Sequence, residues 1–321
     1  MTSVHEKYGT RTTAVFFPSL VALLLLVLFI VCSDTVKNAV TDSLRLSVAS
    51  VVPSVFPCAL LSSILASVGG GEIFGKILGK PLLRIFKTSE NAASAVLLGL
   101  LCGFPIGAVT AFELFKNKAL TEKELFLAVS VSSVPSPAFV IGAVGGAMLG
   151  GRSLGLILYI TVILSNVITA RLFSFKKPTA YERPSEKAPK KPFISAVVSS
   201  VPSAVSATLN VTAYIVFFSA LCACISDITA FFDVPPVFGS MLHGFLEISG
   251  GCAESASLPF CLALPLCALF LGFSGISVHF QIISATDGKI PLGKYFLFML
   301  LRGILCCLLS LAVISSPFDI Y

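Results

Sequence analysis

The sequence predicts an all-α polytopic membrane protein, because apolar side chains dominate the chain and charged ones are scarce. Apolar residues make up 56% of the 321 residues, charged residues make up 12%, and the mean hydropathy is +0.97. A typical soluble domain carries roughly 25% charged residues, which keep its surface in solution. The apolar residues also gather in runs close to the roughly 20 residues that a helix needs to cross a bilayer. This composition excludes an ordinary soluble domain.

Nine apolar runs follow one another along the chain and define the expected helices. They lie near residues 14–32, 48–68, 92–111, 126–149, 153–172, 207–226, 237–256, 258–283 and 295–314. The first run, from Ala14 to Cys32, is longer than the apolar part of a usual signal peptide, and no small-x-small cleavage site follows it closely. We therefore expect this run to remain as a membrane helix.

The 22 Lys and Arg residues indicate how many of the runs cross the membrane. The basic segment 173–192 is placed inside in both layouts. If every run crosses the membrane, nine basic residues fall on the outside. If runs 92–111 and 237–256 turn back instead, 18 of the 22 basic residues fall on the inside. Cytoplasmic loops carry an excess of Lys and Arg. The charges therefore predict about seven spanning helices and two re-entrant hairpins with broken helices. The expected location is the bacterial cell (inner) membrane, multi-pass, with a cytoplasmic N-terminus and a C-terminus outside.

Both runs that are expected to turn back carry glycine or proline in their middle. The first holds Gly99, Gly103, Pro105 and Gly107, and the second holds Gly239, Gly244, Gly250 and Gly251. These residue types permit a sharp reversal where a continuous helix resists one. A non-helical tip inside a membrane is tolerated only within protein or beside a water-filled cavity. We therefore expect the two tips to line a site.

The two halves of the chain share an order of parts that indicates inverted repeats. The matching residues are Ser50–Ser54 with Ser199–Ser203, and Ser136, Phe139 and Ile141 with Ser277, Phe280 and Ile282. In each half a Val-Pro-Ser segment precedes a glycine-rich hairpin and then a long run that Ser, Gly or Pro breaks. Because the two hairpins are expected to open to opposite sides, the halves are related by inversion. Many secondary transporters are built in this way and bind their solute near the midplane.

The repeat predicts five segments along the chain. They are an N-terminal membrane helix and loop (1–47), a first repeat (48–172), a cytoplasmic linker (173–192), a second repeat (193–314) and a tail (315–321). The linker is rich in Lys, Pro and Glu, a composition typical of disorder. Residues 69–90 place four basic side chains at helical spacing and predict an interfacial amphipathic helix that supports the first hairpin.

The candidate solute-binding residues lie at the two hairpin tips, in the two broken runs and in the last run. They are Gly103, Phe104, Pro105, Gly107, Ser133, Ser136, Pro137, Glu247, Ser249, Gly250, Ser274, Gly275, Ser277, His279, Gln281 and Arg302. The N-termini of half-helices carry partial positive charge, which suits a carboxylate-bearing solute. The tips either line a cavity or pack against a neighbouring helix. The hydroxyl groups of Ser133 and Ser136 either bond a solute or cap the broken helix.

Three of these candidates are ionisable groups within apolar runs. Placing an ionisable group inside a membrane is energetically costly, so a functional role is the default hypothesis for each of them. Glu247 is the only acidic residue deep in a run, and we expect it to carry a proton or to hold a structural hydrogen bond. His279 either changes protonation near neutral pH or bonds a backbone carbonyl. Arg302 is the only deep basic residue, and it either balances Glu247 or attracts an anion.

Chemistry on a substrate is not expected, and the chain is not predicted to be an enzyme. The sequence holds no nucleophile elbow, P-loop, paired carboxylates or Cys/His catalytic set. The ten cysteines lie nearly all inside apolar runs, which favours reduced thiols with no metal and no cofactor. The net charge is +6, but no basic stripe with interleaved aromatic residues points to nucleic acid. The expected partners are a small-molecule solute and the lipid bilayer, with a homo-oligomer left open.

Five sequence blocks resemble a known family in their order and spacing. They are Pro53–Pro57, Gly103–Ala108, Ser136–Phe139, Gly244–Gly250 and Gly272–Gln281. Together they are similar to the sporulation integral membrane protein family YlbJ, which belongs to the wider group that carries the nucleoside-recognition Gate domain. The resemblance covers about residues 45–310, and the two predicted repeats are then Gate-like repeats.

The resemblance implies transport. In the sporulating member of the family the solute is dipicolinic acid, so the expected solute is a small anionic aromatic acid that moves by alternating access. The wider group is similar to the core of nucleoside transporters, in which two hairpins and two broken helices enclose the solute. Two alternatives stay open: a carrier of nucleosides or other small solutes, and a non-transporting Gate module that serves a partner protein.

Overall fold

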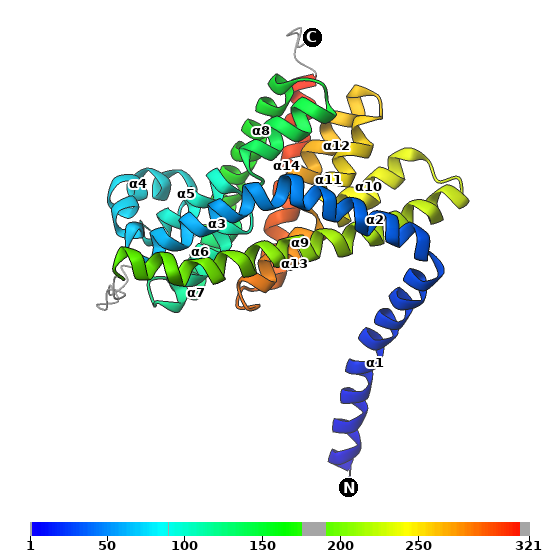
Figure 1. Cartoon of the computed structure of the whole chain (residues 1–321), viewed down its shortest axis with the longest axis horizontal. Helices are drawn as coiled ribbons and strands as arrows, with labels where there is room; N and C mark the ends of the chain where they lie inside the picture. Colours follow the sequence, from blue (N-terminus) through cyan, green and yellow to red (C-terminus); the bar gives the residue numbers. More distant parts are fainter. Residues whose placement is uncertain (1, 89, 175–190, 315–321) are drawn as a thin grey trace.

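The computed structural model describes residues 2–88, 90–174 and 191–314, and every regular element in these ranges is a helix. Figure 1 shows the order of the helices along the chain. Most of the predicted linker and the predicted tail lie outside the described residues. The all-α fold predicted from the composition is confirmed for the part of the chain that the structure describes.

The N-terminal part consists of one projecting helix and one long helical rod. Helix α1 (Thr2–Val31) extends away from the other helices in Figure 1 and meets α2 (Ser33–Leu46) at an angle of 93°. The π-helical turn η1 (Ser47–Val51) joins α2 to α3 (Val52–Ser67). Residues 33–46, which lie between the first two apolar runs in the segment predicted as helix and loop (1–47), are helical. Their polar side chains recur on one side of α2, and the opposite side of α2 packs against α9.

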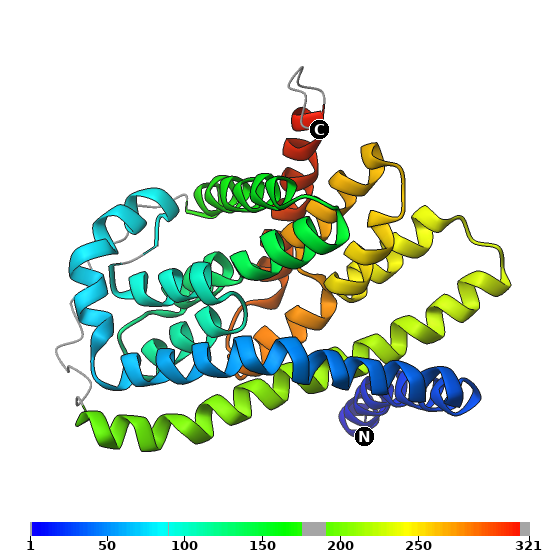
Figure 2. The same cartoon turned by 45° about the horizontal axis from the view of Figure 1, so that its top comes forward.

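Helix α9 (Phe193–Phe231) is 39 residues long and packs along both α2 and α3. Figure 2 shows the rod and α9 side by side across the width of the protein. The sequence predicted only residues 207–226 of α9, because Ser and Pro residues interrupt the apolar run before them. Pro202 lies inside the helix all the same.

The first hairpin is formed by α5 (Ala93–Cys102) and α6 (Ile106–Lys116), which fold back on each other at residues 103–105. Gly103 has φ +80°, a conformation that glycine adopts without strain. A side chain at Gly107 would lie 2.8 Å from the Cα atom of Gly99, so the two arms touch through glycine. Before the hairpin lie α4 (Gly70–Phe86), which forms the helix predicted within residues 69–90, and the short η2 (Glu90–Ala92).

The first broken helix follows the first hairpin. Helix α7 (Glu122–Ser132) begins with a capping box, in which Thr121 and Glu124 each accept a hydrogen bond from the other's backbone N–H. Residues 133–136, which include Pro135, are not helical, and Pro137 leads into the π-helical η3 (Ala138–Met148). Helix α8 (Arg152–Phe173) completes this half of the chain.

The second half repeats the order of hairpin and broken helix. Helices α10 (Pro236–Leu246) and α11 (Ile248–Ala256) form the second hairpin, with Glu247 at its tip. Helices α12 (Phe260–Phe273) and α13 (Gly275–Ala285) form the second broken helix, with Ser274 in the left-handed conformation at the break. Helix α14 (Leu292–Ile314) follows.

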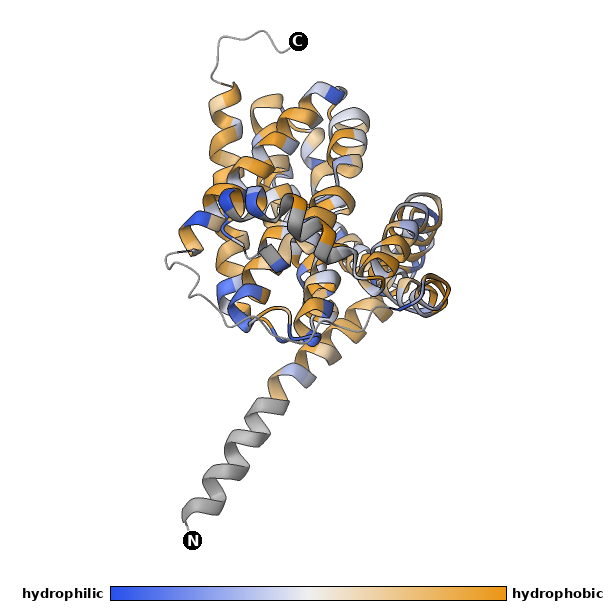
Figure 3. Ribbon diagram, turned by 90° about the vertical axis from the view of Figure 1, so that its left-hand side faces the viewer, coloured by the Kyte–Doolittle hydropathy of each residue, from blue (hydrophilic) through white to orange (hydrophobic). Residues whose placement is uncertain are grey.

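Several helices are long and apolar enough to cross a membrane. By length and composition these are α8, α9, the pair α12–α13, and α14, and the bent pair α1–α2 brings the number in the described ranges to five. In Figure 3 hydrophobic residues predominate along most of the ribbon. The protein is therefore a multi-pass membrane protein. The seven-crossing layout with inverted repeats stays a prediction.

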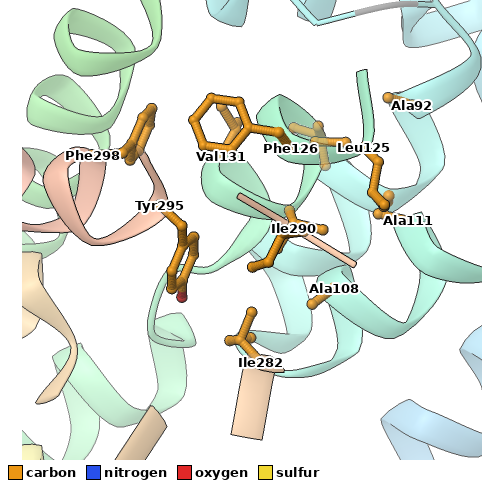
Figure 4. Close-up of a cluster of buried hydrophobic side chains, with 14 of the residues drawn as sticks. Ala92, Ala108, Ala111, Leu125, Phe126, Val131, Ile282, Ile290, Tyr295 and Phe298 are labelled. Carbon is orange, nitrogen blue, oxygen red and sulfur yellow. The ribbon is translucent and has the colours of Figure 1, made fainter. Parts of the chain in front are cut away.

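A buried apolar cluster joins the first half to the second. Hairpin 1 and α7 contribute Ala108, Leu125 and Val131, while the second half contributes Ile282 and Phe298. Figure 4 shows these side chains converging from helices that lie far apart in the sequence. Burial of this surface holds α13 and α14 against hairpin 1, which fixes the position of the second break relative to the first.

Candidate functional site

The two broken helices meet at one buried arginine. Arg302 on α14 is fully buried, and its Nε atom donates to the carbonyl oxygen of Gly272 at 2.7 Å. Nη2 donates to the Ser274 hydroxyl at 3.0 Å, whereas Nη1 lies 3.5 Å from the Ser130 carbonyl and 3.5 Å from Asn166 Oδ1. One guanidinium therefore contacts the end of α7 and the end of α12 together.

The charge of Arg302 is compensated by backbone groups. The free carbonyls at a helix C-terminus carry about half an elementary charge of negative sign, and two such ends point at the guanidinium. Asn166 on α8 is also fully buried, and its Nδ2 atom donates to the Val131 carbonyl at 2.9 Å. Among the described residues no ion pair joins Arg302 to Glu247. We call Arg302, Asn166, Ser130 and Ser274 the break junction.

The tip of hairpin 1 lies on the first break. The backbone N–H of Phe104 donates to the Val134 carbonyl at 2.9 Å, and a Cβ atom at Gly103 would lie 2.7 Å from the backbone nitrogen of Ser136. The hydroxyls of the break bond local backbone: Ser133 Oγ donates to the Val129 carbonyl at 2.7 Å, and Ser136 Oγ accepts from Phe139 N–H at 3.3 Å. Pro137 immediately precedes η3. These hydroxyls thus act as helix caps here.

The tip of hairpin 2 lies on the second break in the same way. Glu247 is 7% exposed and caps α11, because its carboxylate accepts from the backbone N–H groups of Ser249 at 3.0 Å and Gly250 at 2.7 Å. A Cβ atom at Gly275 would lie 3.3 Å from the Ile248 nitrogen of the hairpin. The carboxylate neutralises the positive end of α11, so the candidate Glu247 has a visible structural role.

Helix α13 carries three buried polar residues within its first two turns after the break, with Ser277 and Gln281 one turn apart and His279 between them. The Ser277 hydroxyl, the Nε2 atom of His279 and the Oε1 atom of Gln281 have no hydrogen-bond partner in the described part of the chain. The other ring nitrogen of His279 lies 3.3 Å from the Tyr295 hydroxyl. Buried polar atoms without partners are rare in native proteins, so these atoms are candidates for contact with a solute. Gln281 is the member of this group that faces a cavity.

A cavity of about 280 Å³ lies between α6, α9 and α13. Its polar lining consists of Glu113, Lys116, Ser203, Ser206, Asn210, Gln281 and Ser284. Its apolar lining includes Pro105, at the base of the hairpin 1 tip, and Phe112, whose ring centroid lies 4.5 Å from Lys116 Nζ. A wall of charged, amide and hydroxyl groups in so apolar a protein indicates a water-filled space. We call this space the polar cavity.

The structure separates the sixteen candidate residues into groups. Pro105 and Gln281 line the polar cavity, whereas Ser274 and Arg302 belong to the break junction. Gly103, Phe104, Gly107 and Gly275 lie where a hairpin tip or arm packs against a broken helix. Ser133 and Ser136 bond backbone within the first broken helix, which Pro137 continues, and Glu247, Ser249 and Gly250 form the cap of α11. Ser277 and His279 lie on α13, each with an unpartnered polar atom.

Sequence reasoning missed most of the polar cavity. Glu113 and Lys116 lie at the end of an apolar run, where a charge marks a membrane boundary as readily as a site. Ser203, Ser206 and Asn210 recur at intervals of three and four residues, which places them on one face of α9. This helical spacing is the signal that sequence analysis could have used.

Comparison of the chain with protein-family models, curated proteins and solved structures finds no match. The function is therefore argued from the helices and the polar cavity.

Proposed function

We propose that this protein is a secondary transporter that moves a small organic solute across the bacterial cell membrane by alternating access. The observation that carries the proposal is the pairing of two helical hairpins with two broken apolar helices, whose breaks share Arg302. In known transporters, discontinuous helices of this kind form the solute site inside the membrane. An enzyme is not proposed, because no catalytic set was expected from the sequence.

The predicted membrane layout belongs to this proposal. Seven helices cross, the two hairpins re-enter from opposite sides, the two Gate-like repeats are inverted, and the N-terminus is cytoplasmic. The glycine contacts inside each hairpin support this layout, because they let two short helices lie close enough to fill half a membrane span.

The polar cavity is proposed as the solute site. Its volume of about 280 Å³ is near the lower end of small-molecule pockets, which run from about 300 to 1,000 Å³. The family resemblance gives dipicolinic acid as the first solute to test, and Lys116 supports it by offering a positive charge in the cavity wall. A nucleoside is the second solute to test, because Asn210 and Gln281 offer the amide groups that recognise hydroxyls and bases.

Uptake into proteoliposomes tests the proposal. Vesicles with the purified protein should accumulate labelled dipicolinate or a labelled nucleoside above protein-free vesicles. Gln281→Leu removes a buried hydrogen-bond acceptor and leaves a side chain of similar size. The loss of one hydrogen bond of about 1.4 kcal/mol should weaken the apparent affinity for the solute about tenfold. Asn38→Leu, at an exposed position on α2, should leave affinity unchanged. A folded protein that accumulates neither solute would contradict the proposal for both.

A further inference from the structure

Hairpin 2 carries a histidine–carboxylate pair that the solute site does not use. His243 on α10 and Glu254 on α11 face each other across the hairpin, and the Nδ1 atom of His243 contacts the Oε1 atom of Glu254. The second ring nitrogen, Nε2, lies 3.2 Å from the hydroxyl of Ser226 on α9. His243 is 3% exposed, whereas the Glu254 side chain is 41% exposed. Glu254 therefore connects a buried imidazole to the surface.

This arrangement can gain and lose a proton while all its hydrogen bonds remain. When the imidazole is neutral, Nδ1–H donates to Glu254 and Nε2 accepts from the Ser226 hydroxyl. When the imidazole is charged, both ring nitrogens donate, and the Ser226 oxygen accepts because a hydroxyl serves in either role. Histidine changes protonation closer to neutral pH than any other side chain. The group of three thus has the chemistry of a reversible proton site.

Other titratable groups lie on the elements that pack against the pair. On the hairpin itself and on α9 they are Glu247, Cys252, Cys222, Cys224 and Asp227. On α12 and α13 they are Cys261, Cys267 and His279, and η3 carries none. Glu247 caps α11, and Asp227 accepts from the Thr35 hydroxyl at 2.6 Å. In the described chain none of these groups forms a hydrogen bond or ion pair with His243 or Glu254.

The charge of the site therefore depends on one proton. With His243 protonated, the pair is neutral overall and can remain within the protein. With His243 neutral, the carboxylate has no cation within ion-pair distance in the described residues. The imidazolium attracts the Glu254 carboxylate, so proton binding strengthens the contact between α10 and α11 and makes Nε2–H a donor to the Ser226 hydroxyl of α9.

We infer that His243 and Glu254, with Ser226, form the proton-binding site that couples solute movement to the proton gradient. The inference rests on the proposed transport function and adds its coupling ion. Hairpin 2 is one of the two elements expected to move, and α9, which carries Ser226, also lines the polar cavity with Asn210. A Ser-His-Glu order also occurs in hydrolases, but the polar cavity does not reach Ser226.

The first experiment measures transport. In proteoliposomes, a gradient of one pH unit should change the accumulation of labelled dipicolinate about tenfold, because one proton moves with each solute. His243→Gln and Glu254→Gln should abolish this dependence while solute exchange without a gradient continues. Glu122→Gln, an exposed carboxylate at the start of α7, should keep it. A dependence that persists in both hairpin variants overturns the inference and leaves the transport proposal standing.

The second experiment needs no transport and so separates the two failures. Nitrogen-15 spectra of the three histidines in the purified full chain, assigned with His243→Gln, should show the His243 ring in both protonation states as the pH is varied over the range in which the protein stays folded. If the spectra show this change but no solute is carried, the proton site stands and the transport proposal falls. A ring that keeps one state over this range, or labelling of Ser226 by a fluorophosphonate, overturns the inference.

Discussion

Arg302→Met is expected to cause the largest loss of stability of the substitutions considered. Methionine fills a similar volume but removes the hydrogen bonds to Gly272, Ser274, Ser130 and Asn166. Each buried acceptor left unpaired costs about 1–3 kcal/mol, so the free energy of unfolding should fall by about 3 kcal/mol after relaxation. The loss should also separate the two breaks, because no other side chain in the described chain bonds both.

The protein contains no tryptophan, so thermal unfolding in detergent is best followed with a thiol-reactive fluorogenic dye. Cys252, Cys267 and Cys306 are buried and react only when the helices separate. Arg45→Met is the matched control, because the Arg45 side chain is 79% exposed and surface substitutions change stability by less than about 0.5 kcal/mol. Equal midpoints for the two variants would show that Arg302 does not hold the breaks together.

Gly251→Ala is expected to open hairpin 2. A Cβ atom at Gly251 would overlap the backbone of Gly244 on the facing arm, and one at Gly244 would overlap the ring of Phe270 on α12. Backbone cannot move aside as a side-chain end can, so the arms must separate. Overpacking of this kind costs about 1–3 kcal/mol, and the separation should also weaken the contact between His243 and Glu254. The dye assay measures the first effect, and the nitrogen-15 spectra measure the second.

Gly239→Ala is the control within the same hairpin. No heavy atom lies within 4 Å of a Cβ atom built at this position. Alanine inside a helix is favoured over glycine by about 0.5–1 kcal/mol, so stability should stay equal or rise slightly. If both alanine variants unfold at the same temperature, the close approach of the two arms does not limit stability.

Part of the fold could be predicted from the sequence because local residue types determine it. The reversal at 103–105 and the breaks at 133–136 and at Ser274 lie where glycine, proline and serine predicted them. The long rods were harder to predict. Residues 33–47 and 193–206 lack an apolar run, and they are helical because α2, α3 and α9 pack along one another. Hydropathy finds segments that contact lipid, whereas tertiary packing extends helices beyond them.

The candidate site was predicted less completely, because it depends on contacts between distant segments. The polar cavity needs α6, α9 and α13 together, and its residues range from Pro105 to Ala285. A single sequence shows which positions are polar but not which of them meet. Gln281 was identified because it follows the glycine and serine residues that break the second long run. Glu113 was not, since a charge at the end of a run has an ordinary explanation at the membrane boundary.

The length of α9 has a mechanical consequence. Its 39 residues extend about 58 Å, nearly twice the roughly 30 Å hydrocarbon thickness, so the helix must incline steeply or project from the bilayer. Ser203 and Ser226 lie 23 residues apart along it, about 35 Å. At that lever length a rotation of about 5° at one end displaces the other by about 3 Å. A proton bound near Ser226 can thereby alter the width of the polar cavity near Ser203.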